Sequence, residues 1–193
     1  MLGGAPGGRT LEQVREALTG LTANLNTFIE KSGNIHPMFE SFLTSILIQA
    51  WTGMEVLMRH LLKRSLELHR AHFKHLADDQ AIKLRDSSYQ KLFRIREAYS
   101  QAFNGSPDVL NPINEICVDT LSEVRNLMIH HAGKVDHDFV TRCKDKGITG
   151  WAELEVGKDF PIDGSIVRSQ LDANFKCANK LLRAVDTWLT DNQ

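Results

Sequence analysis

Apolar residues recur every three or four positions along most of this chain, which is the pattern of amphipathic helices. Turn residues such as Ser32-Gly33-Asn34 and Asn104-Gly105-Ser106-Pro107 separate the apolar segments. The pattern predicts helices over residues 10–31, 37–73, 78–101, 108 or 111 to 133, 138–146 and 163–190. The helix over 37–73 is nearly uncharged in its first half, so we expect it at the centre of the domain.

One short segment has a different pattern. Residues 153–156 and 160–162 flank Gly157-Lys158-Asp159, which predicts a small β-hairpin before the last helix. The expected fold is therefore mainly α: an up-and-down helical bundle with this β-hairpin before the C-terminal helix. We expect residues 1–9 to be a flexible leader and residues 10–193 to form a single domain.

Composition narrows the class of protein. Hydrophobic residues make up 42% and charged residues 24%, as in soluble globular proteins. Because no run of 18 apolar residues occurs, we expect no membrane span. The three cysteines are far apart in sequence, and their odd number disfavours a disulfide framework and favours the cytoplasm. Gly-rich phosphate loops, a GxSxG motif and paired catalytic carboxylates do not occur in the sequence, which disfavours ATP-driven and serine hydrolase chemistry.

Charge is unevenly distributed. Residues 59–96 contain ten Lys and Arg against four Asp and Glu, a net of +6, whereas residues 97–193 contain ten against fifteen, a net of −5. This basic segment has two interpretations: an ordinary solvated helix face, or a surface that attracts phosphate. Under the second interpretation the expected RNA-binding residues are Arg59, Lys63, Arg64, Arg70 and Lys74.

The segment from Arg125 to His131 contains the residues best suited to chemistry. It places a permanent cation, a carboxamide and two imidazoles within about two helical turns. Arginine can bind a phosphate, and an imidazole can transfer a proton near pH 7. Asn126 and His130 lie four apart and share a helix face, whereas Arg125 and His130 lie five apart. The same residues could also form an ordinary polar helix end, with histidine near the negative end of the helix dipole.

The order Arg125-Asn126, then His130-His131-Ala132-Gly133, resembles the signature of the HEPN superfamily of small helical domains. The region around Gln49 to Glu55 resembles the long second helix of the RiboL-PSP-HEPN and MAE-type prokaryotic HEPN families. The segment over 156–159 and the helix after it are similar to the same group. The resemblance covers roughly residues 35–190 and implies a HEPN-like bundle.

Many HEPN proteins are metal-independent endoribonucleases, so the resemblance implies cleavage by 2′-OH attack to a 2′,3′-cyclic phosphate. Arg125 would then contact the scissile phosphate, Asn126 would orient it or the histidine, and His130 would be the acid or base. His131 is a second candidate for that role, and Glu55 would hold Arg125. The rival expectation is a non-catalytic HEPN module that binds nucleotide, RNA or a partner protein.

The implied partners are RNA, a second copy of the chain, and an antitoxin or nucleotidyltransferase-like protein, in a toxin or phage-defence role. We expect a homodimer because Leu127 and Ile129 lie outside the main apolar stripe of their helix and could meet a partner. We expect no cofactor and no metal. Histidines at 69, 72 and 75 alternate with Arg70 and Lys74, which repel cations, and those at 130, 131 and 137 match no common metal site.

Overall fold

The computed structural model describes residues 37–86 and 91–192. The leader and first helix expected over residues 1–31 lie outside this part. The described elements are α2 (Pro37–Leu68), the 3₁₀ turn η1 (Arg70–His72), α3 (Asp78–Asp86), α4 (Leu92–Ala102), α5 (Pro107–Ile113), α6 (Ile116–His130), α7 (His137–Asp145) and α8 (Gly164–Asp191). The described chain is thus mainly helical, as the apolar spacing predicts.

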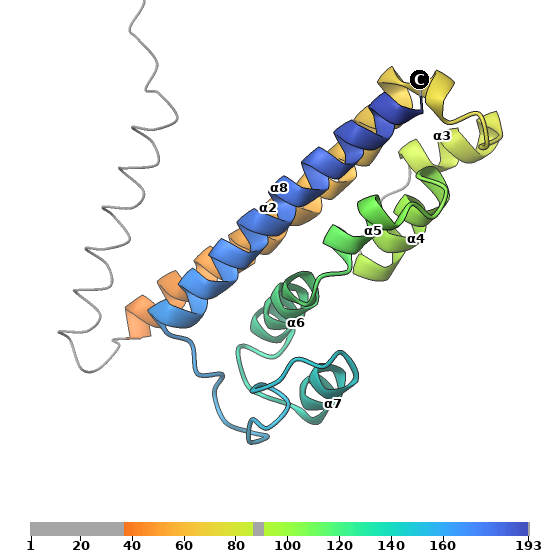
Figure 1. Cartoon of the computed structure of the whole chain (residues 1–193). Coiled ribbons are helices and arrows are strands. Elements are labelled where there is room, and N and C mark those ends of the chain that lie inside the picture. Colours follow the sequence, from red (N-terminus) through yellow and green to blue (C-terminus); the bar gives the residue numbers. More distant parts are fainter. Residues whose placement is uncertain (1–36, 87–90, 193) are drawn as a thin grey trace, which may run out of the picture.

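The two longest helices, α2 and α8, form the axis of the molecule (Figure 1). They lie side by side and run in the same direction, with α4, α5 and α6 packed along them and α7 packed against α6. One face of α2 is buried at a spacing of three or four residues: Leu43, Leu47, Trp51, Met54, Met58, Leu62 and Leu66. This periodic face explains why the segment is helical and why it packs against its neighbours along one side. The rest of α2 is largely exposed or half-buried, so the expected position at the centre of the domain is not confirmed.

Within the described residues, α2 is the one helix long and apolar enough to cross a membrane by length and composition, over Phe39–Leu68. Only 28% of its most apolar window is buried inside the structure. Because the core helix of a soluble bundle can have the same length and composition, the absence of a membrane span stays a prediction.

Aromatic side chains close one end of the bundle. Phe73, just after η1, packs against Phe103 and Trp188, with ring centroids 5.7 and 5.1 Å away. The buried Tyr99 hydroxyl donates to the Met58 carbonyl at 2.8 Å, which ties α4 to α2. Burial raises the pKa of Tyr99, so this phenol stays a neutral donor. Trp188 therefore serves in packing.

The helix expected from residue 108 or 111 to residue 133 is broken into α5 and α6. Glu115 between them is extended, with φ −61° and ψ 142°. Tertiary contacts use the backbone carbonyls at the break: Ile113 accepts from two nitrogens of Arg96 at 3.0 and 2.9 Å, and Pro112 accepts from the Cys177 thiol at 2.8 Å. These two carbonyls thus accept hydrogen bonds from side chains instead of from a continuous helix, so the break is stable.

The expected β-hairpin over 153–162 is wrong. No strand forms in the described residues, and one antiparallel bridge joins Lys134 to Asp159. The amide of Val135 donates to Lys158 at 2.9 Å, and the amide of Gly157 donates to Val135 at 2.8 Å. The segment thus pairs with the chain leaving α6 rather than with itself, which holds the loop before α8 against the end of α6.

Candidate functional site

The Arg125 to His131 segment lies at the C-terminal end of α6. Two consecutive residues in the left-handed region, Ala132 at φ 50° and Gly133 at φ 78°, turn the chain away from the helix axis. The amides of His131 and Gly133 both donate to the Leu127 carbonyl, at 3.0 and 3.2 Å. The segment is therefore a capped helix end, with the two histidines exposed at its tip.

Arg125 and Asn126 form a neighbouring pair within α6. The guanidinium of Arg125 donates through Nη1 to Asn126 Oδ1 at 3.0 Å, and both residues are partly buried. No carboxylate in the described part of the chain lies within ion-pair distance of Arg125. Its charge is therefore not neutralised there by an acidic side chain, which suits contact with an anion.

The two histidines have different surroundings. His131 Nδ1 lies 3.0 Å from Asp136 Oδ2, and its side chain is 43% exposed. The other oxygen of Asp136 accepts the amide of Phe139 at 2.6 Å and caps α7, which fixes the carboxylate in place. A carboxylate beside Nδ1 can accept a hydrogen bond from that nitrogen and so orient the ring. His130 is exposed, with no comparable carboxylate among the described residues.

The expected ion pair between Glu55 and Arg125 is not formed. Glu55 Oε1 lies 3.5 Å from Arg59 Nη1, one turn further along α2. A partner on the same helix satisfies the carboxylate locally, so Glu55 needs no cation from α6.

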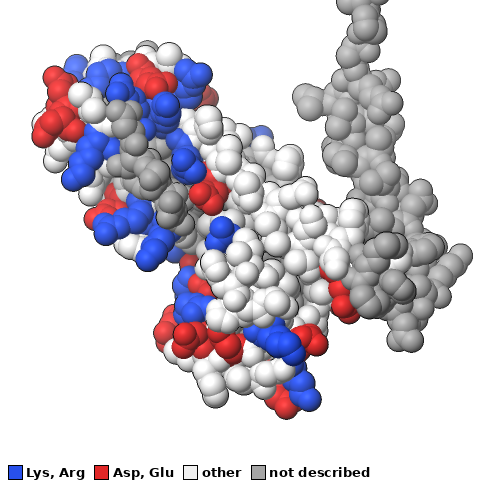
Figure 2. Space-filling view, turned by 180° about the vertical axis from the view of Figure 1, so that it is seen from behind, with Lys and Arg blue, Asp and Glu red and all other residues white. Residues whose placement is uncertain are grey.

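Most of the predicted RNA-binding residues also have acidic partners. Arg59 pairs with Glu55, and both Lys63 and Arg64 pair with Glu67. Arg70 lies 2.8 Å from Asp78 and donates to two backbone carbonyls near the end of η1. Lys74 is exposed. Figure 2 shows acidic residues interspersed among the basic ones at this end of the molecule. This mixture weakens the attraction of the segment for phosphate.

The predicted RNA-binding residues from Arg59 onward along α2 also lie away from the Arg125 to His131 segment within one chain. Thr44 Oγ1 contacts Met128 Sδ at 3.9 Å, so the end of α6 adjoins the first third of α2. Arg59 is fifteen residues beyond Thr44, about 22 Å at 1.5 Å per residue. Within one chain, Arg59 therefore does not border the motif.

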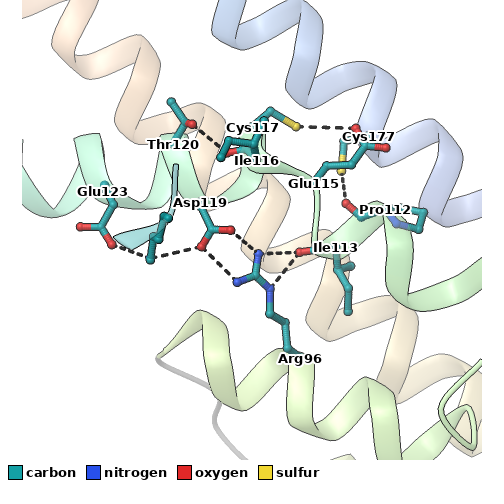
Figure 3. Close-up of polar contacts among 11 residues, drawn as sticks. Arg96, Pro112, Ile113, Glu115, Ile116, Cys117, Asp119, Thr120, Glu123 and Cys177 are labelled. Atoms are coloured by element: carbon teal, nitrogen blue, oxygen red, sulfur yellow. Dashed lines mark hydrogen bonds and ion pairs between the residues drawn. The ribbon is translucent and has the colours of Figure 1, made fainter. Parts of the chain in front are cut away.

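A charged network that the sequence interpretation missed lies on α6, nearer its N-terminal end than Arg125. Asp119 accepts two hydrogen bonds from Arg96, at 3.0 and 2.8 Å, and lies 3.1 Å from Lys146 (Figure 3). Glu123, 4% exposed, lies 2.7 Å from both Arg142 and Lys146. The sequence contained a signal for this network, because two acidic residues four apart on a mostly apolar helix need cationic partners when they are buried.

Electrostatics in this network favour the charged forms. Burial, the largest effect, opposes ionisation of Asp119, but the hydrogen bonds and charges of Arg96 and Lys146 outweigh it and lower the pKa of Asp119. Burial likewise opposes the charge of Lys146, yet Glu123 and Asp119 raise its pKa. Each charged side chain of this network has an oppositely charged partner. The network joins α4, α6 and α7 and so positions α6.

Comparison of this chain with family models, with curated proteins and with solved structures produced no match. The resemblance to HEPN domains therefore rests on the sequence alone.

Proposed function

We propose that this chain is a metal-independent endoribonuclease of the HEPN type, with its active site at the C-terminal end of α6. The observation that carries the proposal is the contact of His131 Nδ1 with Asp136 Oδ2 at 3.0 Å. A fixed carboxylate beside an exposed imidazole makes a general base, as in other enzymes that orient a histidine. Arg125, which lacks an acidic partner in the described chain, adds the cation that a phosphate needs.

The proposed reaction has two proton transfers. The basic imidazole nitrogen removes the proton of the ribose 2′-OH, and the freed oxygen attacks the adjacent phosphorus while the bond to the 5′ oxygen breaks. A proton returns to that leaving oxygen, so the products are a 2′,3′-cyclic phosphate and a 5′-hydroxyl. Arg125 stabilises the charge on the phosphoryl oxygens, and Asn126 holds the guanidinium in position.

Contacts in the structure favour His131 over His130 as the proton-transfer residue, because only His131 is oriented by a carboxylate among the described residues. The sequence resemblance favours His130 through its spacing from Arg125. Both residues are exposed, and both therefore belong in the test.

The test is incubation of the purified chain with single-stranded RNA in EDTA. Arg125→Ala should lose at least about 100-fold in rate, and so should the alanine variant of the proton-transfer histidine. Asp136→Asn separates the two histidines: asparagine still caps α7 but cannot hold the His131 tautomer. If His131 acts, Asp136→Asn and His131→Ala both lose activity, whereas His130→Ala does not.

His137→Ala is the matched control, since His137 is an exposed histidine six residues from His131. This variant should cleave RNA at the wild-type rate. Equal cutting by the wild type and every variant would identify a contaminating nuclease, and the proposal would then be withdrawn.

The second candidate is a non-catalytic HEPN module that binds nucleotide, RNA or a partner protein. It is favoured by the angle between Arg125 and His130, which are both helical and five residues apart, about 140° around the axis at 3.6 residues per turn. One helix presents such a pair poorly to a single phosphate. RNA binding without cleavage, and expression that is not toxic, would favour this second function.

A toxin or phage-defence role, with an antitoxin or nucleotidyltransferase-like partner, forms part of the same proposal. Growth arrest on expression that disappears in Arg125→Ala supports it, and so does a nucleotidyltransferase-like gene beside this one.

A further inference from the structure

Two cysteines that are sixty residues apart in sequence lie together in the fold. Cys117 is in the first turn of α6, and Cys177 is in the middle of α8. Their sulfur atoms and a carboxylate oxygen of Glu115 all lie within 4.8 Å of one another. Glu115 comes from the break between α5 and α6, and its Oε2 is 4.0 Å from Cys117 Sγ (Figure 3). Two thiols and a carboxylate are a donor set for a thiophilic cation.

The spacing suits a tetrahedral ion. Zn–S bonds of about 2.3 Å and Zn–O bonds of about 2.0–2.2 Å place neighbouring ligand atoms roughly 3.5–3.8 Å apart. The present separation of 4.0 Å between Glu115 Oε2 and Cys117 Sγ requires only a small closure. Cys177 is fully buried and Cys117 is 9% exposed, so little water competes for the sulfur atoms.

A lysine already orients the carboxylate. Lys180 Nζ lies 2.6 Å from Glu115 Oε1, which leaves Oε2 toward the thiols. Partners of this kind fix the orientation of a metal ligand. The charges also balance, because a divalent ion with two thiolates and one carboxylate has a net charge of −1, which Lys180 offsets.

A cavity of about 840 Å³ adjoins the cluster, and Glu115 and Cys117 line it together with Arg168, Lys176 and Ser169. We propose that Glu115, Cys117 and Cys177 bind Zn²⁺ through three protein ligands, with the fourth coordination position open to this cavity. Three protein ligands and an open position distinguish such a centre from a closed structural zinc site.

Binding replaces two thiol protons. Proximity to Cys177 lowers the pKa of Cys117, whereas Cys117 and burial raise the pKa of Cys177, so Cys117 ionises first. In the metal-free chain the Cys177 thiol donates to Pro112 O at 2.8 Å, a bond that is given up when its proton leaves. Two protons therefore pass to solvent for each ion bound, and affinity rises with pH.

This site is separate from the proposed ribonuclease site. Cys117 and His130 are thirteen residues apart on α6, about 20 Å along its axis. Cleavage of RNA in EDTA and binding of Zn²⁺ can therefore succeed or fail independently.

The experiment titrates the full chain, reduced and freed of metal, with Zn²⁺ by calorimetry and with Co²⁺ by its thiolate charge-transfer absorption. We expect one ion per chain, with the absorption lost in Cys117→Ser and Cys177→Ser. Cys143→Ser is the matched control, because Cys143 is buried but lies outside the cluster, and it should bind normally. Lys180→Ala should lower affinity by about 10–100-fold, the usual effect of removing an orienting partner.

Glu115→Gln keeps the shape of the side chain and tests the site if a cysteine variant fails to fold; it should lower affinity while the circular dichroism spectrum is unchanged. The proposal is overturned by any of three results: a reduced chain that takes up no Zn²⁺ or Co²⁺, equal binding by wild type and Glu115→Gln, or loss of binding in Cys143→Ser as great as in Cys117→Ser.

Discussion

The Nε atom of Arg142 lies 2.7 Å from Oε2 of Glu123, a carboxylate that is 4% exposed on α6. The other oxygen of Glu123 lies 2.7 Å from Lys146 Nζ, so one acid joins the middle of α6 to the C-terminal end of α7. Burial opposes the charge of Arg142, but the hydrogen bond and charge of Glu123 raise its pKa. This contact holds α7, and with it Asp136, against α6.

Glu123→Ala should destabilise the fold by about 3 kcal/mol. Removing one partner of a buried pair usually costs 3–5 kcal/mol, and we expect the lower end because Arg142 and Lys146 are about one-third exposed and can reach water. Urea unfolding measures the change. Glu155→Ala is the control: Glu155 is 76% exposed, and its loss should alter stability by less than about 0.5 kcal/mol. Equal effects of the two substitutions would contradict the role of Glu123.

Stability should fall with acid through Asp119. Its pKa in the folded chain lies below the ordinary value of 3.8, so the folded state binds this proton less readily than the unfolded state does. The stabilisation is therefore complete above that ordinary value and is lost as pH falls through it toward the folded pKa. The free energy of unfolding, measured from pH 5 to pH 3, should fall less steeply in Asp119→Asn than in the wild type. Asp159→Asn, at an 84% exposed position, should keep the wild-type slope.

Substitution of two glycines by alanine should change the stability of the fold in opposite directions. Gly133 has φ 78°, and an added Cβ would lie 3.3 Å from Met128 Sδ, so Gly133→Ala should destabilise by about 1 kcal/mol or more. Gly53 is exposed within α2, with nothing within 4 Å of the added atom. Gly53→Ala should stabilise by up to about 1 kcal/mol through helix propensity. Thermal unfolding measures the stability of both variants against the wild type. A change of the same sign in both would refute the argument.

A homodimer in solution is the next prediction. A two-fold axis beside α6 would bring both Arg125 side chains and both histidine pairs into one cleft, which overcomes their poor alignment on one helix. Ile129 is 46% exposed next to His130 and is the apolar residue available for that contact. Leu127 is fully buried in the core, so its expected place in the interface is wrong.

Light scattering should give about twice the chain mass of 21.8 kDa, and Ile129→Lys should shift the protein toward the monomer. Phe175→Lys, at a 71% exposed position on α8, is the control and should leave the dimer intact. A wild-type chain that is monomeric at micromolar concentration would leave the shared cleft without support and favour the non-catalytic function.

Most helices could be predicted from the sequence, because the spacing of apolar residues depends on which local face must be buried. The expected helices over 138–146 and 163–190 correspond closely to α7 and α8. The motif from Arg125 to His131 and its place before the Ala132-Gly133 turn were also apparent from the sequence, since a helix end has local signals.

Contacts between distant segments were decided only by the tertiary structure. The break at Glu115 depends on Arg96 binding the Ile113 carbonyl, and the pairing of residues 157–160 with the end of α6 depends on backbone groups that carry no sequence signal. Glu55 instead pairs with Arg59 on its own helix, a contact at i,i+4 spacing that the sequence already allowed. Cys117 and Cys177 show no motif in the sequence, because helix packing alone brings their sulfur atoms together.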